Sequence, residues 1–441
     1  MTVRSEPASR SIKKQIVAWA LWDWGSAAFN AVVTTFVFTV YLTSAHGFGD
    51  TNFVSEMLGW ALGISGLLVA LLAPITASRS DGSGRRKFWL GINTGVVVVS
   101  IALLYFVAPT PQLLWLGLGL LAVGTLFYEL AYVNYNSILL QISNPTNIGR
   151  VSGFGWAAGY FGGIVLLLIL LVGFIFPDVG WFGVTSENGL NIRVAMVVAA
   201  AWFAVSAIPV LVAVPEVRAT RAPGARLGLF ASYAKLFADI RKLWREDRNL
   251  VWFLLSSAVF RDGLTGVFTF GGVLAAAVFG FSSTEVVLFA IAGNVIAGIA
   301  TLLFSVLDDK FGPKPVIIGS LTILSTAGLL LFIMHDSGKL AFWVIGLILA
   351  AFVGAPQSAS RTYLSRMIPA GREGEIFGLY ATTGRAAVFL APTAFALAIR
   401  LTGETVSGIL GLVAVLLLGL LLLLPVARPP LAGKPASDSV S

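Results

Sequence analysis

Charged and polar side chains occur inside stretches of this sequence that are otherwise apolar. The candidates are Asp23, Asn30, Glu129, Asn136, Arg261, Asp262, Asn294 and Arg385. A charge at the bilayer centre costs about 2.5–3.5 kcal/mol even on the mild insertion scale, so such residues usually mark a solute or ion path. A carboxylate there can carry a proton, and a guanidinium can bind the carboxylate or phosphate of a solute. The structural alternative is an ion pair of Asp262 with Arg261 or Arg385.

The depth of each charge in its predicted helix separates their roles. At 1.5 Å per residue, Asp262 lies about 18 Å from the start of its helix, Arg385 about 15 Å and Asp23 about 11 Å. We therefore predict Asp262 as the first candidate for a proton carrier, Asp23 as the second, and Arg385 as the anchor of an anionic group. Glu129 lies in the inner half of its helix, where its side chain can also reach water.

Other chemistries have little support in the sequence. It contains no cysteine and only two histidines, His46 and His335, which fall at predicted outer helix ends. It has neither metal-ligand spacing nor a phosphate-binding Gly-x4-Gly-Lys-Ser/Thr loop. We expect no metal, no cofactor and no ATP-driven pump in this chain. A polytopic membrane enzyme is disfavoured because no histidine–carboxylate cluster is present.

The composition is that of a membrane protein. Hydrophobic residues make up 57% of the 441 positions and charged residues 11%, against about 45–50% and 25% in soluble domains. A membrane-spanning helix needs about 20 mostly apolar residues. The predicted spans are 16–44, 57–77, 88–108, 112–136, 152–176, 192–214, 250–279, 284–306, 315–335, 340–364, 375–400 and 404–425. We therefore predict an all-α polytopic membrane protein with twelve transmembrane helices.

Basic residues indicate the orientation of these helices. Of the 29 lysines and arginines, 24 fall in segments or at span ends that are inside if the amino terminus is inside, three fall on the outer side, and Arg261 and Arg385 lie deeper within spans. Basic loops face the cytoplasm, so both termini are predicted to be cytoplasmic and the first helix to be uncleaved. The net charge of +8 does not indicate nucleic-acid binding, because the basic residues are distributed over loops.

The longest polar interval, residues 215–249, joins two apolar halves. Leu229, Tyr233, Leu236, Ile240 and Leu243 recur within it at helical spacing. We predict an amphipathic helix on the inner membrane surface, either as a simple cover or with a binding role. The expected organisation is a basic tail (1–15), a six-helix bundle (16–214), this linker (215–249), a second six-helix bundle (250–425) and a disordered tail (426–441).

The two halves share sequence landmarks. Ser78–Lys87 follows the second predicted helix, and the similar Asp308–Lys314 follows the eighth. Gly149, Gly153 and Gly159 match Gly374, Gly378 and Gly384 at one common offset. Such a pair of pseudo-symmetric bundles is typical of transporters that arose by duplication. The residues of the two loops with a predicted gating role are Asp81, Gly84, Arg85, Arg86, Asp309, Lys310, Gly312 and Lys314.

Glycines spaced by four on the fifth predicted helix indicate close packing. Gly155, Gly159 and Gly163 lie on one face, which leaves that face free of side chains. We predict that a neighbouring helix packs there. A dinucleotide-binding role is disfavoured, because no strand precedes these glycines.

The two loops resemble the motif Gly-x3-Asp-Arg/Lys-x-Gly-Arg/Lys-Arg/Lys of the major facilitator superfamily (MFS). The first copy has Ala77 and Gly82 where the motif has glycine and a basic residue, and the second copy begins with Ser305. A narrower resemblance is to the vacuole-effluxer-like branch, which is similar to autophagy-linked amino-acid exporters. It rests on Trp19–Phe29, Tyr135–Leu140, Gly149–Trp156 and Gly371–Tyr380.

The resemblance implies a fold in which helices one, four, seven and ten line a cavity. It implies an amino acid or related metabolite as the solute and export as the direction. We interpret the chain as a secondary transporter of a small polar solute that works by alternating access, and Asp262 and Asp23 predict proton coupling. A drug or sugar carrier of the same fold and a transport-inactive receptor or scaffold are the alternatives. The expected partners are the solute, protons and the lipid bilayer. We expect a monomer in a bacterial inner membrane.

Overall fold

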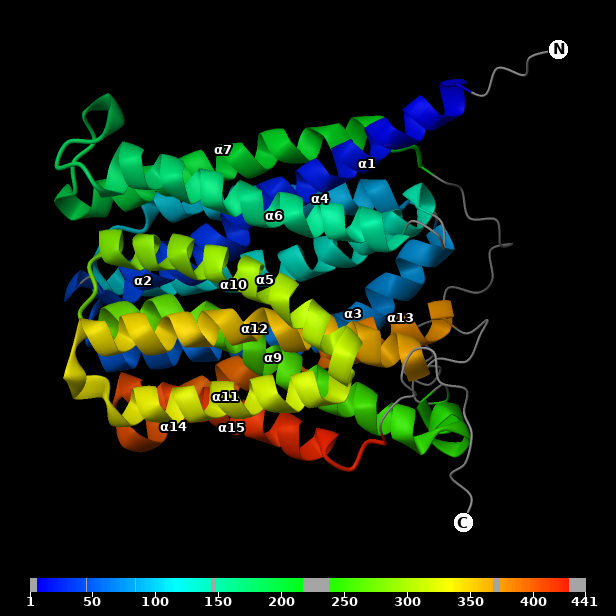
Figure 1. The fold of residues 1–441 in the computed structure, drawn as a ribbon. Coiled ribbons are helices and arrows are strands. Elements are labelled where there is room, and N and C mark those ends of the chain that lie inside the picture. The colour runs from blue at the N-terminus through cyan, green and yellow to red at the C-terminus, as the bar shows by residue number, and fades with distance from the viewer. Residues whose placement is uncertain are drawn as a thin grey trace. The chain divides into compact units, whose positions relative to one another are not determined.

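A computed structural model of the chain describes residues 6–44, 46–83, 85–143, 148–216, 238, 240–367 and 373–427. These residues are almost entirely helical (Figure 1), with one isolated β-bridge between Val179 and Thr185. Within them, twelve helical segments are long and apolar enough to span a membrane, and their ranges overlap the predicted ones throughout. The predicted all-α polytopic membrane fold is therefore confirmed.

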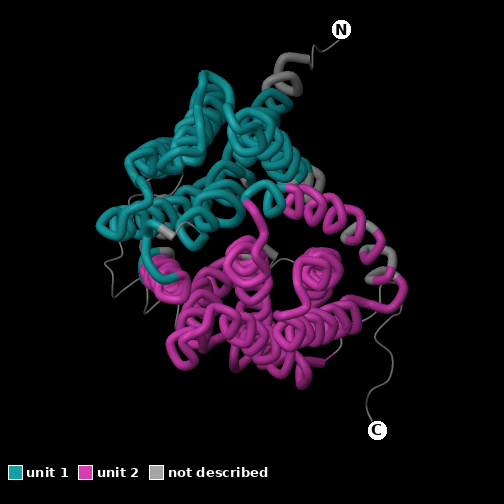
Figure 2. The backbone as a smooth tube through the Cα atoms, turned by 90° about the vertical axis from the view of Figure 1, so that its left-hand side faces the viewer, with its two compact units in different colours: residues 1–50, 71–232, 283–287 teal, residues 51–70, 233–282, 288–441 magenta. Residues whose placement is uncertain are grey.

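The chain divides into two compact units (Figure 2). Unit 1 comprises Met1–Asp50, Leu71–Ser232 and Ser283–Val287, and unit 2 comprises Thr51–Ala70, Tyr233–Ser282 and Leu288–Ser441. These units differ from the halves of the sequence at two helices. The first part of α3 groups with unit 2, and the first residues of α10 group with unit 1. The two predicted bundles describe the sequence, whereas the units describe which segments pack together.

The helices that lie mainly in unit 1 are α1 (Glu6–Ala27), η1 (Ala28–Phe36), α2 (Phe38–Ser44), η2 (His46–Phe48), α4 (Arg86–Leu103), η3 (Leu104–Phe106), α5 (Pro111–Ile142), α6 (Ile148–Leu170), η4 (Leu171–Ile175), η5 (Trp181–Gly183), η6 (Glu187–Gly189) and α7 (Leu190–Ala213). Helix α3 (Thr51–Ser83) passes from unit 2 to unit 1. In unit 1, α1 packs against α6 and α7, and α4 packs against α5 and α7.

The first membrane span contains a π-helical segment. Helices α1, η1 and α2 follow one another, and η1 is a π-helix of nine residues. Thr34 and Thr35 each donate a hydrogen bond from Oγ1 to the carbonyl oxygen of Asn30, both at 2.7 Å. π-Helical turns within α-helices occur frequently at functional sites. The segment that contains Asn30 therefore has an irregular backbone that hydropathy does not reveal.

The glycine face of α6 packs against α1, as the spacing predicted. A Cβ added at Gly155 would lie 2.5 Å from the Trp19 ring, and one added at Gly159 would lie 3.3 Å from the Asp23 carboxylate. At Gly163 the nearest atom is the Cβ of Ala27, at 3.4 Å. The absence of side chains on this face allows α6 to approach the bulky Trp19 and Trp24 region of α1.

Unit 2 contains α9 (Arg248–Ala277), most of α10 (Ser283–Phe311), α11 (Pro313–Ile333), η7 (His335–Ser337), α12 (Lys339–Met367), α13 (Glu373–Ala386), α14 (Leu390–Thr402), η8 (Thr405–Ser407) and α15 (Gly408–Leu423). Helix α9 packs against α12, α13 and α15, while α11 packs against α12 and α15. The core includes stacked ring pairs, with Phe253 and Tyr363 at 4.3 Å and Phe270 and Phe395 at 3.9 Å between centroids.

Most of the predicted linker helix lies outside the described residues, which omit 217–237 and 239. Residues 240–246 are helical. Leu243 is buried in the core of unit 2, and the exposed Trp244 lies 6.0 Å from Trp252 between ring centroids. The first part of the predicted basic tail, residues 1–5, and the carboxy-terminal residues 428–441 also lie outside the described part.

Candidate functional site

Asp262 lies on α9 and anchors the start of another helix of unit 2. Its side chain is 5% exposed, and its Oδ2 accepts a hydrogen bond of 2.6 Å from the backbone N–H of Ala391. The first N–H groups of a helix have no partner within the helix and carry a partial positive charge, so a carboxylate is a favourable partner there. From the sequence, we considered an ion pair of Asp262 with Arg261 or Arg385. In the described structure, Asp262 forms neither of these ion pairs.

The helix start that Asp262 contacts exists because the eleventh predicted span is interrupted. Helix α13 ends at Ala386 and α14 begins at Leu390, with a turn between them. Pro392 in the first turn of α14 cannot donate to the carbonyl of Val388, and its ring clashes with a carbonyl at that position in a continuous helix. Across the turn, Leu390 N–H donates to Ala387 O at 2.9 Å. The break therefore exposes the N–H of Ala391, which the Asp262 carboxylate satisfies.

Arg261 lies beside Asp262 on α9 and contacts α13. Its guanidinium carbon lies 4.1 Å from the centroid of the Tyr380 ring. A Cβ added at Gly384 would lie 3.1 Å from Arg261 Nη2 and 3.2 Å from Nη1. Tyr380 and Gly384 are four residues apart, so they share one face of α13. The guanidinium therefore lies along a surface formed by an aromatic ring and a bare stretch of backbone.

A hydroxyl pair fixes the Tyr380 ring. The Tyr380 hydroxyl and Ser360 Oγ are 2.6 Å apart, and Ser360 Oγ also donates to the carbonyl oxygen of Gln357 at 2.9 Å. Because serine has a single hydroxyl proton, Tyr380 is the donor in the first of these bonds. Both side chains are buried, so the ring that supports Arg261 has a defined position.

A second polar cluster lies in unit 1, on α1, η1 and α5. Ser26 Oγ shares its proton between Asp23 Oδ1 at 3.1 Å and the Asp23 carbonyl oxygen at 2.9 Å, Tyr128 OH donates to Ser26 Oγ at 3.4 Å, and Asn30 Nδ2 donates to Tyr128 OH at 2.6 Å. The four side chains form a continuous chain of hydrogen bonds that runs from an exposed amide to a half-buried carboxylate. Such a chain can orient a solute or pass a proton through its hydroxyls.

Aromatic rings surround this second cluster. Trp22 stacks on Tyr135 at 4.4 Å and on Tyr128 at 6.1 Å, and Trp19 stacks on Tyr135 at 4.4 Å. Trp22 Nε1 donates to Thr94 Oγ1 at 3.0 Å, and Trp19 Nε1 donates to the carbonyl of Tyr135 at 3.0 Å. Sequence reasoning did not select Tyr128, although Tyr128, Tyr132 and Tyr135 recur at helical spacing. That spacing was the available signal.

Two other predicted membrane residues form hydrogen bonds within their own helices. Asn136 and Asn294 each donate to the carbonyl four residues earlier in their own helix, Tyr132 and Ala290 respectively, both at 2.8 Å. Glu129 is half-buried on α5, and Arg385 is half-buried in the last turn of α13. The structure thus brings Asp23 and Asn30 together in unit 1, and it brings Arg261 and Asp262 to the α13–α14 region in unit 2.

The residues of the predicted gating loops differ in what they contact. Arg86 Nη1 donates to the carbonyl of Ser137 at 3.3 Å in unit 1. Arg85 lies over the Phe88 ring at 5.9 Å, and Lys310 lies over the Phe311 ring at 5.3 Å. Gly84 lies outside the described residues, as do the side chains of Asp81 and Asp309. The predicted gating role of these two aspartates therefore remains a prediction.

The second loop also stabilises a helix end. Gly312 has a positive φ of 86°, a conformation that favours glycine, and α11 begins directly after it. Lys314 Nζ donates to the carbonyls of Leu424, at 2.8 Å, and Val426 at the end of α15. A cation is favourable at a helix carboxy terminus because the last carbonyls lack partners and carry partial negative charge.

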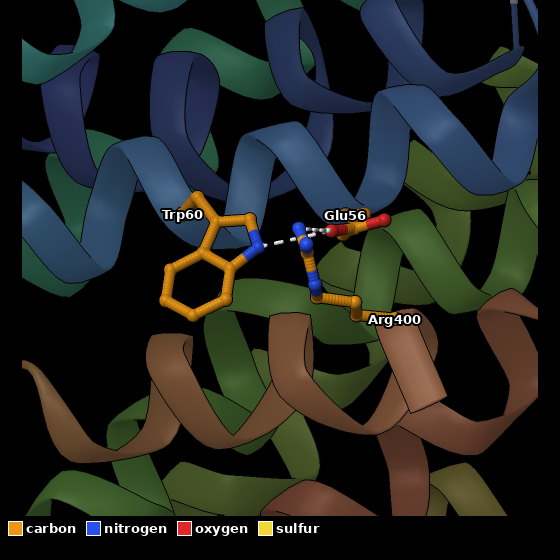
Figure 3. Close-up of polar contacts among 3 residues, drawn as sticks. All are labelled: Glu56, Trp60 and Arg400. Carbon is orange, nitrogen blue, oxygen red and sulfur yellow. Dashed lines mark hydrogen bonds and ion pairs between the residues drawn. The ribbon is translucent and has the colours of Figure 1, made fainter. Parts of the chain in front are cut away.

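A polar contact joins α3 and α14 within unit 2 (Figure 3). Glu56 Oε1 accepts hydrogen bonds from Trp60 Nε1 at 3.1 Å and from Arg400 Nη1 at 3.4 Å. Nearby, Asn52 Oδ1 accepts from the backbone N–H and the hydroxyl of Thr405, both at 2.8 Å. Glycines of α3 also face α14. A Cβ added at Gly59 would lie 2.9 Å from the Cβ of Ala396.

Metal ligation has no support in the described part of the chain. Its histidine and carboxylate side chains include no group of three that could hold a metal ion. The side chains of both clusters can form hydrogen bonds, pair with charges and transfer protons. Such groups bind and release polar solutes, and they line paths through membrane-embedded proteins.

Comparisons with known proteins agree with this fold. The family model described as "Vacuole effluxer Atg22 like" matches residues 141–429. The MFS-type transporter YxiO of Bacillus subtilis (strain 168) is 25% identical over 414 residues, which cover 93% of this chain and 94% of YxiO. Autophagy-related protein 22 of Cryptococcus neoformans var. neoformans serotype D (strain B-3501A) is 27% identical over 293 residues. That match covers 60% of this chain and half of the fungal protein.

Solved structures show the same fold at low sequence identity. The inward-open xylose transporter XylE from E. coli superposes with a TM-score of 0.66 at 14% identity, covering 96% of this chain and 97% of XylE. The twelve spans found here are therefore arranged in an established transporter fold. Identity at this level bears on the fold alone.

Proposed function

The chain belongs to the vacuole effluxer Atg22-like family and is a membrane transporter of the MFS type, and on this basis we propose that it is a secondary transporter of a small polar solute. The observation that carries the proposal is the pair of polar clusters within apolar helices. One contains Asp23 and Asn30, and the other contains Arg261 and Asp262. Charged residues within membrane-spanning helices are costly and usually mark a solute or ion path.

Amino acids or related metabolites are the proposed solutes, and export is the proposed direction. An amino acid carries both an ammonium and a carboxylate, so it suits the cluster of unit 2, which contains both Arg261 and Asp262. The description of the family as effluxers supports export. We further propose alternating access driven by a proton gradient, with Asp262 as the first carrier and Asp23 as the second. Arg385 is retained as a proposed contact for an anionic solute group.

The membrane orientation is also a proposal. The distribution of basic residues supports a cytoplasmic location for both termini. The bacterial relative supports an inner-membrane location. The loop residues Asp81 and Asp309 are proposed to control the transition between conformations.

Counterflow in proteoliposomes tests the proposed activity. Vesicles with purified protein are loaded with one unlabelled L-amino acid at a time, and uptake of the same labelled amino acid is measured. We expect protein-dependent exchange of at least one amino acid, whereas protein-free vesicles show none. Exchange of D-xylose without exchange of any amino acid would favour the sugar-carrier alternative. The absence of exchange for every solute would favour a receptor or scaffold.

A further inference from the structure

One guanidinium nitrogen of Arg261 is buried without a hydrogen-bond acceptor, which is energetically unfavourable. Its Nη1 is buried and has no hydrogen-bond partner among the described residues. Its neighbour Asp262 instead accepts from the N–H of Ala391, and no described carboxylate forms an ion pair with Arg261. A buried N–H group without an acceptor costs more free energy when it belongs to a cation than when it belongs to a neutral group. The free state of this site is therefore incomplete.

The surroundings hold Arg261 in place without neutralising it. The Tyr380 ring supports the guanidinium by a cation–π contact at 4.1 Å, and the hydroxyl pair with Ser360 fixes that ring. Gly384 allows the guanidinium to lie close to the backbone of α13. This support restricts the side chain, so less entropy is lost when a ligand binds. The arrangement is that of a prepared anion site.

We infer that Arg261 binds the carboxylate of the transported solute, with Tyr380 and Gly384 as its supporting surface. This inference rests on the proposed transport function and specifies the chemical class of the solute. A carboxylate supplies both the missing acceptor for Nη1 and the missing negative charge, whereas a neutral carbonyl or hydroxyl supplies only the acceptor. Guanidinium and carboxylate groups are also complementary in plane and spacing. Amino acids belong to this class, and neutral sugars do not.

Ligand-induced thermal stabilisation of the purified full-length protein tests this assignment. The probes are the twenty L-amino acids, the corresponding amino-acid amides, inorganic phosphate and D-xylose. Binding to the folded state raises the melting temperature by mass action. We expect at least one amino acid to stabilise the wild-type protein and its amide, which lacks the carboxylate, to do so far less. Stabilisation by phosphate alone, by D-xylose alone or by no amino acid would overturn the inference.

Substitutions at Arg261 test whether this residue binds the stabilising amino acid. Arg261→Ala is expected to weaken the binding of the stabilising amino acid by about 10- to 100-fold, the equivalent of a hydrogen bond to a charged group. Arg261→Lys keeps the charge but loses the planar fork, so its affinity should fall between those of the wild type and Arg261→Ala. An unchanged affinity in Arg261→Ala contradicts the assignment, as does a response that Arg385→Ala abolishes while Arg261→Ala retains it.

A pair of glycine substitutions on α13 provides a control for folding. Gly384→Ala places a Cβ 3.1–3.2 Å from the guanidinium nitrogens, whereas an added Cβ at Gly378 meets no atom within 4 Å. Gly384→Ala should therefore weaken amino-acid binding more than Gly378→Ala, while both keep Arg261. Equal affinities in two variants with native unliganded melting temperatures would contradict the proposed geometry.

The binding and counterflow results separate this inference from the proposed function. Binding that depends on Arg261 without exchange in proteoliposomes would refute transport and support the carboxylate site. Amino-acid exchange with unchanged binding by Arg261→Ala would support transport and refute the site.

Discussion

At the scale of single residues, the two best-placed carboxylates differ in their hydrogen-bond partners. Asp262 accepts from a backbone N–H at the start of α14, whereas Asp23 accepts from the hydroxyl of Ser26. A backbone N–H can only donate, while a serine hydroxyl can donate or accept. Loss of charge at Asp262 therefore weakens its hydrogen bond with the N–H at the start of α14. Loss of charge at Asp23 allows the Ser26 hydroxyl to reorient. Protonation of the two residues would have different structural consequences.

Residue size limits how α6 approaches α1. Gly162 faces the backbone carbonyl of Trp24, and an added Cβ would overlap with that oxygen. Because both groups belong to helix backbones, the helices must move apart to relieve the overlap. We predict that Gly162→Ala destabilises the protein by about 1–3 kcal/mol, as overpacking typically does. Thermal melting of the detergent-solubilised protein measures this effect.

Gly95 on α4 is the matched position for this prediction. An added Cβ at Gly95 meets no atom within 4 Å, and alanine is favoured over glycine within a helix. Gly95→Ala should therefore melt at or above the wild-type temperature. If Gly162→Ala melted at the wild-type temperature, the close approach of α6 to α1 would be disproved.

At the scale of helices, the irregular segments are the features that the sequence did not predict. Hydropathy identifies an apolar stretch of sufficient length, and it marked the first and eleventh spans as continuous. The structure has a π-helix at Ala28–Phe36 and a turn between Ala386 and Leu390. Both are accompanied by tertiary contacts, Asn30 with Tyr128 and Asp262 with Ala391. Only Pro392 gave a local signal for the second interruption.

Only part of each candidate site could be predicted from the sequence, because the roles of its other residues depend on tertiary contacts. Asp23, Arg261 and Asp262 could be selected because a charged residue in an apolar stretch is conspicuous by type alone. Tyr128, Ser360 and Tyr380 are of types that are common in helices, so their roles depend on which distant residues pack against them. Tyr380 supports Arg261 from a position over one hundred residues away in the sequence.

The contact between α3 and α14 leads to a prediction about movement. Helix α3 belongs to the amino-terminal half of the sequence and α14 to the carboxy-terminal half, and alternating access requires the two halves to rock. The two helices should therefore separate during each cycle. A Cβ at Gly59 lies 2.9 Å from that of Ala396, and a small shift reaches the roughly 3.8 Å of a disulfide. We predict that oxidised Gly59→Cys/Ala396→Cys loses counterflow and that dithiothreitol restores it.

The two single cysteine variants are the controls for this cross-link. The chain has no native cysteine, so neither variant can form an intramolecular disulfide. Both should keep counterflow under oxidising conditions. Full counterflow by the cross-linked double variant would mean that α3 and α14 remain together throughout transport.

At the scale of the whole molecule, the sorting of basic residues predicts topology. Segments rich in lysine and arginine are retained in the cytoplasm, which places Ser83 inside and Asp50 outside. We predict that Asp50→Cys reacts with an impermeant thiol reagent applied to intact cells, and that Ser83→Cys reacts only after permeabilisation. Labelling of Ser83→Cys in intact cells would reverse the orientation. The cysteine-free wild type provides the background signal.

The last prediction links the protonation of Asp262 to the energy source of the whole transporter. If Asp262 carries the coupled proton, removing its charge should uncouple solute movement from the pH gradient without preventing solute movement. Asp262→Asn suits this test because the amide oxygen can still accept the N–H of Ala391, which the carboxylate now accepts at 2.6 Å. We expect this variant to retain counterflow but to lose accumulation driven by a pH gradient. Asp262→Ala, which loses the acceptor as well, should also melt at a lower temperature, because a buried N–H is left without a partner at a cost of about 1–3 kcal/mol. Both assays are run on the same proteoliposome preparations, so that protein content and leak are identical. Wild-type accumulation by Asp262→Asn would assign the proton to another group, with Asp23 and Glu129 as the next residues to replace.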